Sequence, residues 1–420
     1  MIVESPYLPD NKVLQPIITG MMQLHRVSPS LGFLAENPPQ RLPQSRQNII
    51  LDKFFQQMDE TSYELPDIIR EKRVRHTVDL MPVFLSAADY TSDFYDGLSY
   101  ETKQRLMFIL GMLTHAYFVE VCDYKTVDEL KADDSIKHLP AQLAIPLWYV
   151  AKDLGYTPSL SYGLYSHWNW RKPNPANGLG LRNIALLHSF SGTTDEFWFV
   201  WIHQIMEKTF APAIPALLKA ILLANPEVCI SGNATTKRME RCLEKAGRAM
   251  QRCVNVLERM RDHCDPKTYF SSVRMFYSFP RNVIFDGVEE VEGQAQNFYG
   301  ESGMQTPIMH FLLAALGQYP IDDQYFPTAR RHMPATFRNF VELTLAESKV
   351  HEYVLGPHTS RHLVRRYDML THSLLDWRAE HLPLANDFIA QHGEGHGTGS
   401  TPMPWLAEHY ERTKKFIIQH

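Results

Sequence analysis

Apolar residues recur every three or four positions through most of the chain, which is the period of an amphipathic helix. The pattern begins after residue 48, where Ile49, Ile50, Phe54, Phe55 and Met58 share one helical face. Further helices are predicted over residues 106–119, 141–154, 197–206, 238–263, 337–354 and 359–389. No segment shows sustained strand-type alternation, and the sequence contains no internal repeat. The pattern therefore predicts a mainly α protein.

Two predicted helices have recognisable starts. Pro140 precedes the apolar residues 141–154 and Gly155 follows them, as is typical of a first turn and a C-cap. Thr193 and Glu196 have capping-box spacing before the almost wholly apolar residues 197–206, so this helix is expected to be buried on nearly every side. Residues 238–263 could form a coiled-coil seam, but the run is short and favours one long core helix.

Turn-forming residues divide the chain. Residues 1–48 are rich in proline, and residues 32–43 are expected to be extended and to wrap over a domain. Residues 168–180 contain two prolines and two glycines, which makes them the best candidate linker. We predict a smaller, mostly helical N-terminal domain over residues 1–178 and a larger all-helical domain over residues 179–420. The glycine-rich residues 392–401 are expected to form a mobile loop.

Composition narrows the class of protein without identifying it. The net charge is −5, which gives no electrostatic reason to expect nucleic acid or a membrane surface as a partner. The five cysteines are odd in number and contain no C-x-x-C pair, which argues against a disulfide framework, a zinc ribbon and a c-type haem attachment. The N-terminus lacks a signal-peptide pattern, and no window approaches eighteen uninterrupted apolar residues. We expect a cytoplasmic protein in a reducing compartment.

Motif searches exclude several chemistries. The chain has no phosphate-binding loop, no nucleophile elbow, no dinucleotide fingerprint and no Glu-x-x-His pair of the kind that binds two irons. His392 and His396 have metal-ligand spacing, but a glycine-rich loop lacks the rigidity that a metal site needs.

Two residues keep a choice open. His381 shares a helical face with Leu374, Trp377 and Phe388, so it is either a metal ligand or a neutral core histidine bonded to backbone carbonyls. Pro383 predicts a kink there that would free the carbonyl of residue 379 to orient the imidazole. Arg274 lies in an aromatic segment, where it either pairs with a carboxylate of the protein or receives one from a ligand.

The chain resembles the indoleamine 2,3-dioxygenase family of haem enzymes. The similar segments follow one another in order between about Gly32 and Thr401, and no single one is decisive. They are residues 32–38, 139–146, Tyr162 with 169–170, 191–196 with 198–199, 270–274, 300–305, 333–340, 378–381 and 397–401. The resemblance implies a small N-terminal domain over a large all-α domain that holds haem b.

The resemblance also implies roles for individual residues. His381 takes the position of the proximal iron ligand, and Arg378 that of an arginine that supports a haem propionate. Arg274 matches the residue that pairs with the substrate carboxylate, and the loop with Thr398 matches a flap that closes on substrate. The residues that fall where the family lines the distal, substrate-binding pocket are Tyr162, Phe199, Tyr269, Phe270, Arg274, Ser302 and Gly303. The implied reaction inserts both atoms of dioxygen across the indole C2=C3 bond of tryptophan or a derivative at a ferrous haem, giving an N-formylkynurenine-type product.

Four residues in the same pocket depart from the family. His203 replaces a small hydroxyl residue, and its imidazole could bond either the indole N–H or the oxygen at the iron. Tyr165 and Tyr269 replace smaller or less polar residues, and Glu301 stands where glycine is usual. These changes keep alternatives open: an enzyme of secondary metabolism that mono-oxygenates or rearranges a substituted tryptophan, a non-catalytic haem sensor or carrier, and a helical scaffold without haem. The sequence does not give the exact substrate or the oligomeric state.

Overall fold

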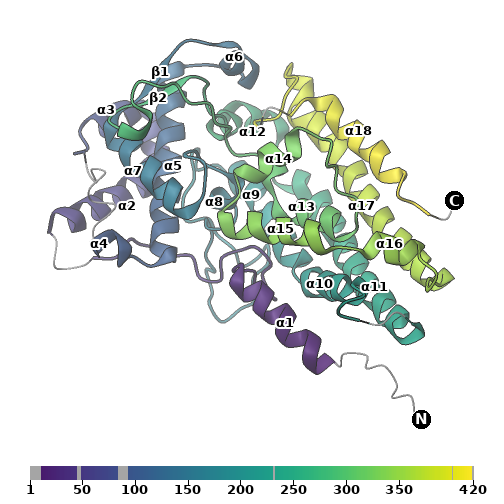
Figure 1. Ribbon diagram of the computed structural model, residues 1–420. Helices are drawn as coiled ribbons and strands as arrows, with labels where there is room; N and C mark the ends of the chain where they lie inside the picture. Colours follow the sequence, from purple (N-terminus) through teal and green to yellow (C-terminus); the bar gives the residue numbers. More distant parts are fainter. Residues whose placement is uncertain (1–10, 45–48, 84–92, 230–231, 400, 419–420) are drawn as a thin grey trace.

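The computed structural model describes residues 11–44, 49–83, 93–229, 232–399 and 401–418 (Figure 1). The first part contains α1 (Asn11–Leu24), α2 (Ile49–Arg70), α3 (Val74–Asp79), α4 (Asp93–Asp96), α5 (Tyr100–Cys122), α6 (Val127–Ala132), β1 (Lys137–Leu139), α7 (Ala141–Leu154) and α8 (Tyr162–Tyr165). The second contains α9 (Thr194–Phe210), α10 (Ala213–Ala224), α11 (Asn233–Leu257), α12 (Pro266–Ser272), β2 (Val283–Phe285), α13 (Pro307–Ala315), α14 (Tyr325–Arg331), α15 (Ala335–Glu347), α16 (Val350–Leu355), α17 (Arg361–Phe388) and α18 (Met403–Lys414).

The mainly α fold is confirmed, and the predicted helix ends are formed by the residues expected. Helix α7 has Pro140 at its N-cap, and Gly155 closes it in the left-handed conformation, with φ of 71°. Thr193 caps α9 by accepting a hydrogen bond from the backbone N–H of Glu196. On α2, Phe54, Phe55 and Met58 are buried as the periodicity predicts.

Three local predictions were wrong. Residues 11–24, which lie before the point where the helical pattern was expected to begin, form α1, because Leu14, Ile18 and Met22 make one buried face despite Pro16. The predicted helix over 337–354 is interrupted between α15 and α16. Two short parallel strands, β1 and β2, were not predicted, since three residues are too few to show alternation.

Helices α11 and α17 form the frame on which the later part of the chain is built. They pack along each other, and α11 also contacts α9 and α10. The apolar stripe of α11 is buried throughout, including Leu243, Met250 and Leu257, which agrees with a single long core helix. Both helices therefore present fixed faces to whatever lies between them and the neighbouring loops.

The two parts of the chain share one main hydrophobic core. Figure 1 shows α2, α3, α5 and α7 gathered on one side of the molecule, whereas α1 lies beside α10 of the second part. The main buried cluster runs from Leu14 to Trp405, and the boundary at residue 178 stays a prediction. Helix α5 is long and apolar enough to cross a membrane by length and composition alone, but it is mostly buried inside the fold, as a core helix is.

Candidate functional site

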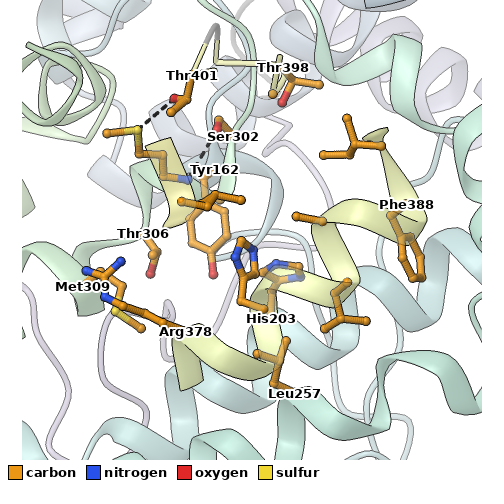
Figure 2. Close-up of a pocket in the computed structure, with 18 of the residues that line it drawn as sticks. Tyr162, His203, Leu257, Ser302, Thr306, Met309, Arg378, Phe388, Thr398 and Thr401 are labelled. Atoms are coloured by element: carbon orange, nitrogen blue, oxygen red, sulfur yellow. Dashed lines mark hydrogen bonds between the residues drawn. The ribbon is translucent and has the colours of Figure 1, made fainter. Parts of the chain in front are cut away.

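A cavity lies between α17, α9, α11 and the loops around residues 301 and 398 (Figure 2). Residues that the sequence places far apart meet on its wall. The predicted site residues that line it are Tyr162, Phe199, His203, Tyr269, Arg274, Glu301, Ser302, Gly303, Arg378, His381 and Thr398. Apolar side chains such as Met250, Leu257 and Leu384 supply much of the remaining wall.

Two predicted pocket residues do not line this cavity. The hydroxyl of Tyr165 donates to the buried carboxylate of Glu196, which turns the side chain into the core. Phe270 stacks on His392 instead, with ring centroids 4.4 Å apart and an interplanar angle of 21°. The next residue in the chain, Tyr269, lines the cavity, so the two neighbours face different surroundings.

His381 reaches the cavity from α17 as a neutral imidazole. Its ring lies parallel to the indole of Trp377, four residues earlier, with centroids 4.9 Å apart and an angle of 9°. No hydrogen bond joins the ring to any residue that the structure describes. Burial, helped by the nearby His203 and Arg378, lowers the pKa of His381 to about 4. An uncharged imidazole with free ring nitrogens is the form that binds a metal.

The expected role of Pro383 was wrong. Helix α17 runs through Pro383 as far as Phe388, and no described hydrogen bond links the carbonyl of Ala379 to the ring of His381. Stacking on the indole of Trp377, and not a hydrogen bond to the carbonyl of Ala379, orients the imidazole of His381. The sequence contained this signal, because residues four apart on a helix lie on the same face.

Arg378 is a buried cation whose counterion is missing from the described part of the chain. Its side chain lines the cavity, and its Nε has no hydrogen-bond partner. Burial lowers the pKa of Arg378 to about 10, so the guanidinium stays charged at neutral pH. A buried charge of this kind is stable only when an anion is supplied. The imidazole of His381 and this guanidinium, three residues apart above an apolar wall, fit a haem that presents iron to one and a propionate to the other.

His203 faces the cavity in a tautomer that its own hydrogen bond fixes. Its Nδ1 lies 2.8 Å from the carbonyl oxygen of Phe199, and because a carbonyl only accepts, Nδ1 carries the proton. Burial lowers the pKa of His203, so the ring is neutral. Nε2 therefore offers a lone pair, and no described residue occupies it. The ring stands between Phe199 and Tyr162, at centroid distances of 4.6 and 5.8 Å.

A buried polar cluster centred on Glu207 lies one helical turn after His203. Oε1 of Glu207 accepts hydrogen bonds from the hydroxyls of Tyr162 at 3.2 Å and Thr306 at 2.9 Å. Nε2 of His167 lies 3.2 Å from the same oxygen. The cluster fixes the hydroxyl of Tyr162 at the cavity wall. Thr306 and His167 were not predicted, and nothing in their local sequence marks them.

Arg274 is already paired with a carboxylate of the protein. Its Nε donates to Oε2 of Glu394 at 2.7 Å, and its Nη2 donates to the same oxygen and to the carbonyl of His396 at 2.7 Å. Both side chains are buried. The internal pair weighed from the sequence is therefore formed, but Nη1 has no partner among the described residues. Because Arg274 also lines the cavity, Nη1 can still receive a ligand carboxylate.

The loop after α17 is held closed over the cavity. The hydroxyl of Thr398 donates to the carbonyl of Glu301 at 2.6 Å, and the N–H of Gly395 donates to Asp128 at 2.8 Å. Gly399 packs so closely that a Cβ there would lie 2.8 Å from the Cβ of Ser302. The close contact with Ser302 explains why residue 399 is a glycine. Ser400 lies outside the described residues, and the mobility of the loop stays a prediction.

Glu301 projects into the cavity as a carboxyl group without a partner. Its residue is 5% exposed, and neither oxygen of the side chain bonds any described residue. Burial raises the pKa of Glu301 to about 8, so most of it is protonated at neutral pH. The acid acts as a donor and an acceptor at once in that form.

Comparisons with known proteins agree with this geometry. The family model described as indoleamine 2,3-dioxygenase matches residues 21–414. Indoleamine 2,3-dioxygenase 1 of Mus musculus is 25% identical, over 95% of this chain and 96% of its own length. An indoleamine 2,3-dioxygenase of Aspergillus candidus is 25% identical over 92% of this chain and 95% of its own length. A 6-hydroxytryptophan 2,3-dioxygenase of Fusarium equiseti is 25% identical over 93% of this chain and 92% of its own length.

Proposed function

The chain belongs to the indoleamine 2,3-dioxygenase family and is therefore a haem-dependent dioxygenase; we propose that it opens the indole ring of tryptophan or a tryptophan derivative at C2=C3. The product would be of the N-formylkynurenine type. We further propose haem b, ferrous in the active form, with His381 as the iron ligand and Arg378 as the partner of a propionate. When bound, the haem supplies the iron that activates dioxygen towards the indole.

The observation that carries this proposal is a pair of complementary groups on one cavity wall. Nε2 of His203 is an acceptor, and Nη1 of Arg274 is a donor with positive charge. Tryptophan presents the matching pair, a donating indole N–H and an anionic carboxylate. His203 was considered for two roles, accepting a hydrogen bond from the indole N–H or donating one to dioxygen. Its tautomer favours the first, because a donor to dioxygen would need the proton on Nε2. His203 is thus proposed to hold the indole N–H.

The remaining residues would position the substrate and exclude water. Phe199 and Tyr269, whose rings lie 4.5 Å apart, offer an aromatic surface for the indole. The closed loop, latched by Thr398 and Glu394, would separate the reacting atoms from bulk solvent. Closing the site keeps the bound indole in one orientation, which is the contribution a protein makes when a cofactor carries the chemistry.

A second candidate, a substituted tryptophan as the natural substrate, has support of its own. His203, Tyr269 and Glu301 alter the wall that would face the indole. A relative of similar identity is named for 6-hydroxytryptophan, so the family includes an enzyme with a modified substrate. For the compartment, we propose a reducing cytoplasm, which is supported by the lack of a disulfide among the five cysteines.

One experiment separates the candidate functions. The protein is loaded with haem, reduced, and given L-tryptophan and ¹⁸O-labelled dioxygen, and the product is analysed by mass spectrometry. Incorporation of two labelled atoms supports the dioxygenase. A product of L-tryptophan or of a hydroxytryptophan that carries one labelled atom or none contradicts it and favours the mono-oxygenation or rearrangement. A haem absorption band without turnover of any indole amino acid would favour a sensor, and the lack of that band would favour a scaffold.

A further inference from the structure

The backbone that carries Glu301 is clamped from two sides. A Cβ on Gly300 would lie 2.0 Å from the carbonyl oxygen of Tyr277, so the loop can approach residues 277 and 278 this closely only with glycine. On the other side, the hydroxyl of Thr398 binds the carbonyl of Glu301. The backbone of Glu301 is thus held at a fixed place beside the cavity that its side chain lines.

Four tyrosines lie within electrostatic reach of this carboxyl group. Burial raises the pKa values of Tyr162, Tyr165, Tyr269 and Tyr277, and the charge of Glu301 adds to the rise at each of them. Two of these hydroxyls are already used, since Tyr162 bonds Glu207 and Tyr165 bonds Glu196. The hydroxyl of Tyr277 has no described hydrogen-bond partner, and no described hydrogen bond joins Tyr269 to Glu301, so none of the four tyrosines satisfies the carboxyl group.

The cations of the site do not satisfy Glu301 either. Arg274 is paired with Glu394, and no described ion pair or hydrogen bond joins Glu301 to Arg274 or Arg378. A carboxyl group that is 5% exposed and has no partner is costly, because burial removes its hydration without replacing it. A buried carboxyl group without a hydrogen-bond partner is explained if the ligand supplies that partner.

The substrate has two polar positions left to offer, the α-ammonium group and any substituent on the benzene edge of the indole. Because Glu301 keeps its proton at neutral pH, it matches a hydroxyl group, which donates and accepts, better than an ammonium group, which only donates. In the proposed function, on which this inference rests, Arg274 takes the carboxylate and His203 takes the indole N–H. The benzene edge of the indole remains, and in tryptophan itself it has no hydrogen-bonding group. We propose that Glu301 is a specificity-determining residue that hydrogen-bonds a hydroxyl group on the benzene ring of the substrate. The preferred substrate is then a hydroxytryptophan.

The test compares binding as well as turnover. Dissociation constants of L-tryptophan, of its 4-, 5-, 6- and 7-hydroxy derivatives and of the matching methoxy compounds are measured from the change in the haem spectrum of the loaded protein. One hydroxy isomer should bind about tenfold more tightly than tryptophan, as expected for one buried hydrogen bond. In Glu301→Ala this preference should disappear while tryptophan binding stays within about twofold. Glu301→Gln, which keeps a donor and an acceptor, should retain most of the preference for the hydroxy isomer.

Several outcomes would overturn the inference. One is a ratio of hydroxytryptophan to tryptophan affinity that is equal in wild type and Glu301→Ala. Another is a loss of discrimination between tryptophan and indole-3-propionate in Glu301→Ala, which would assign Glu301 to the α-ammonium group. Because binding is measured without turnover, a failed dioxygenase assay with an intact affinity ratio would count against the proposed reaction alone. Glu290→Ala removes a carboxylate that pairs with Lys152 away from the cavity, so it serves as the matched control and should leave the ratio unchanged.

Discussion

The guanidinium of Arg274 is bonded to the carboxylate of Glu394, 120 residues later in the chain, and both side chains are buried. The remaining oxygen of Glu394 accepts the backbone N–H of Val127 at 2.5 Å. The residue that the resemblance assigns to the substrate carboxylate is therefore also the anchor of the loop that covers the cavity. Substrate recognition and loop closure share one cation.

Replacing Glu394 should destabilise the protein and loosen the loop. Glu394→Gln leaves the buried charge of Arg274 without its counterion, which typically costs about 3–5 kcal/mol. The free energy of unfolding, measured with urea, should fall by about that amount. Asp322→Asn, in the exposed pair with Arg412, is the control and should leave the free energy of unfolding nearly unchanged, because solvent screens an exposed pair. Equal effects of the two variants would show that Glu394 is no anchor.

Removing His381 should abolish iron ligation without unfolding the chain. His381→Ala is expected to lose the absorption spectrum of a histidine-bound haem, because no second imidazole stands on the same helical turn. Added imidazole should restore that spectrum by filling the space beside Trp377. His372→Ala, on the same helix, is the control, since its ring bonds the carbonyl of Asp368. A normal spectrum in His381→Ala would refute the ligand assignment.

The hydrogen bond proposed for His203 can be tested with a substrate that lacks the donor. Wild type should favour L-tryptophan over 1-methyl-L-tryptophan, whose ring nitrogen carries no proton. His203→Ser should weaken tryptophan binding by roughly fivefold to tenfold, the value of one neutral hydrogen bond. The substitution should also reduce the preference for L-tryptophan over 1-methyl-L-tryptophan. Measured kcat/KM ratios for the two substrates decide the matter. If rate, product and preference are all unaffected by the substitution, His203 has no such role.

Glu301 should make stability depend on pH in a defined direction. The pKa of its carboxyl is 4.5 ordinarily and about 8 in the folded protein, so between these values the folded state binds the extra proton. Stability from this group is complete below pH 4.5 and is lost as pH rises through 8, by up to about 1.4 kcal/mol per pH unit. Unfolding free energies of wild type and Glu301→Gln, measured from pH 5 to 9, should converge as pH falls and separate as it rises. Parallel curves would contradict the shift.

The parts of the site that the sequence predicted are those built from neighbours on one helix. Arg378 and His381 lie three residues apart on α17, and helical geometry alone places both side chains on related faces. The resemblance to a known family then gave each a role. Trp377 belongs to the same predicted face, and its stacking on His381 follows from their four-residue spacing on the helix.

Contacts between distant segments could not be predicted. Glu394 sits in a glycine-rich loop, and nothing near it indicates Arg274 as its partner. Thr306 and Glu207 are 99 residues apart, and their hydrogen bond depends on how the loop after residue 300 packs on α9. Tyr165 illustrates the reverse case, since matching a pocket position did not reveal that its hydroxyl turns to Glu196. In each case tertiary packing, absent from local patterns, decides the partner.

The order in which the cavity-lining segments are synthesised affects how the protein acquires haem in the cell. Segments from Tyr162 to Leu406 enclose the cavity, and His381 follows most of them in the chain. A ribosome adds residues from the N-terminus at roughly 5–20 per second, so α9 and α11 emerge before His381, the proposed iron ligand, has been added. Haem loading must then follow synthesis, and we expect cells starved of haem to accumulate an inactive, haem-free reserve. If protein synthesis is first blocked and haem is then added, the haem-free protein should become active. Activity that returns only when new protein is synthesised would contradict this expectation.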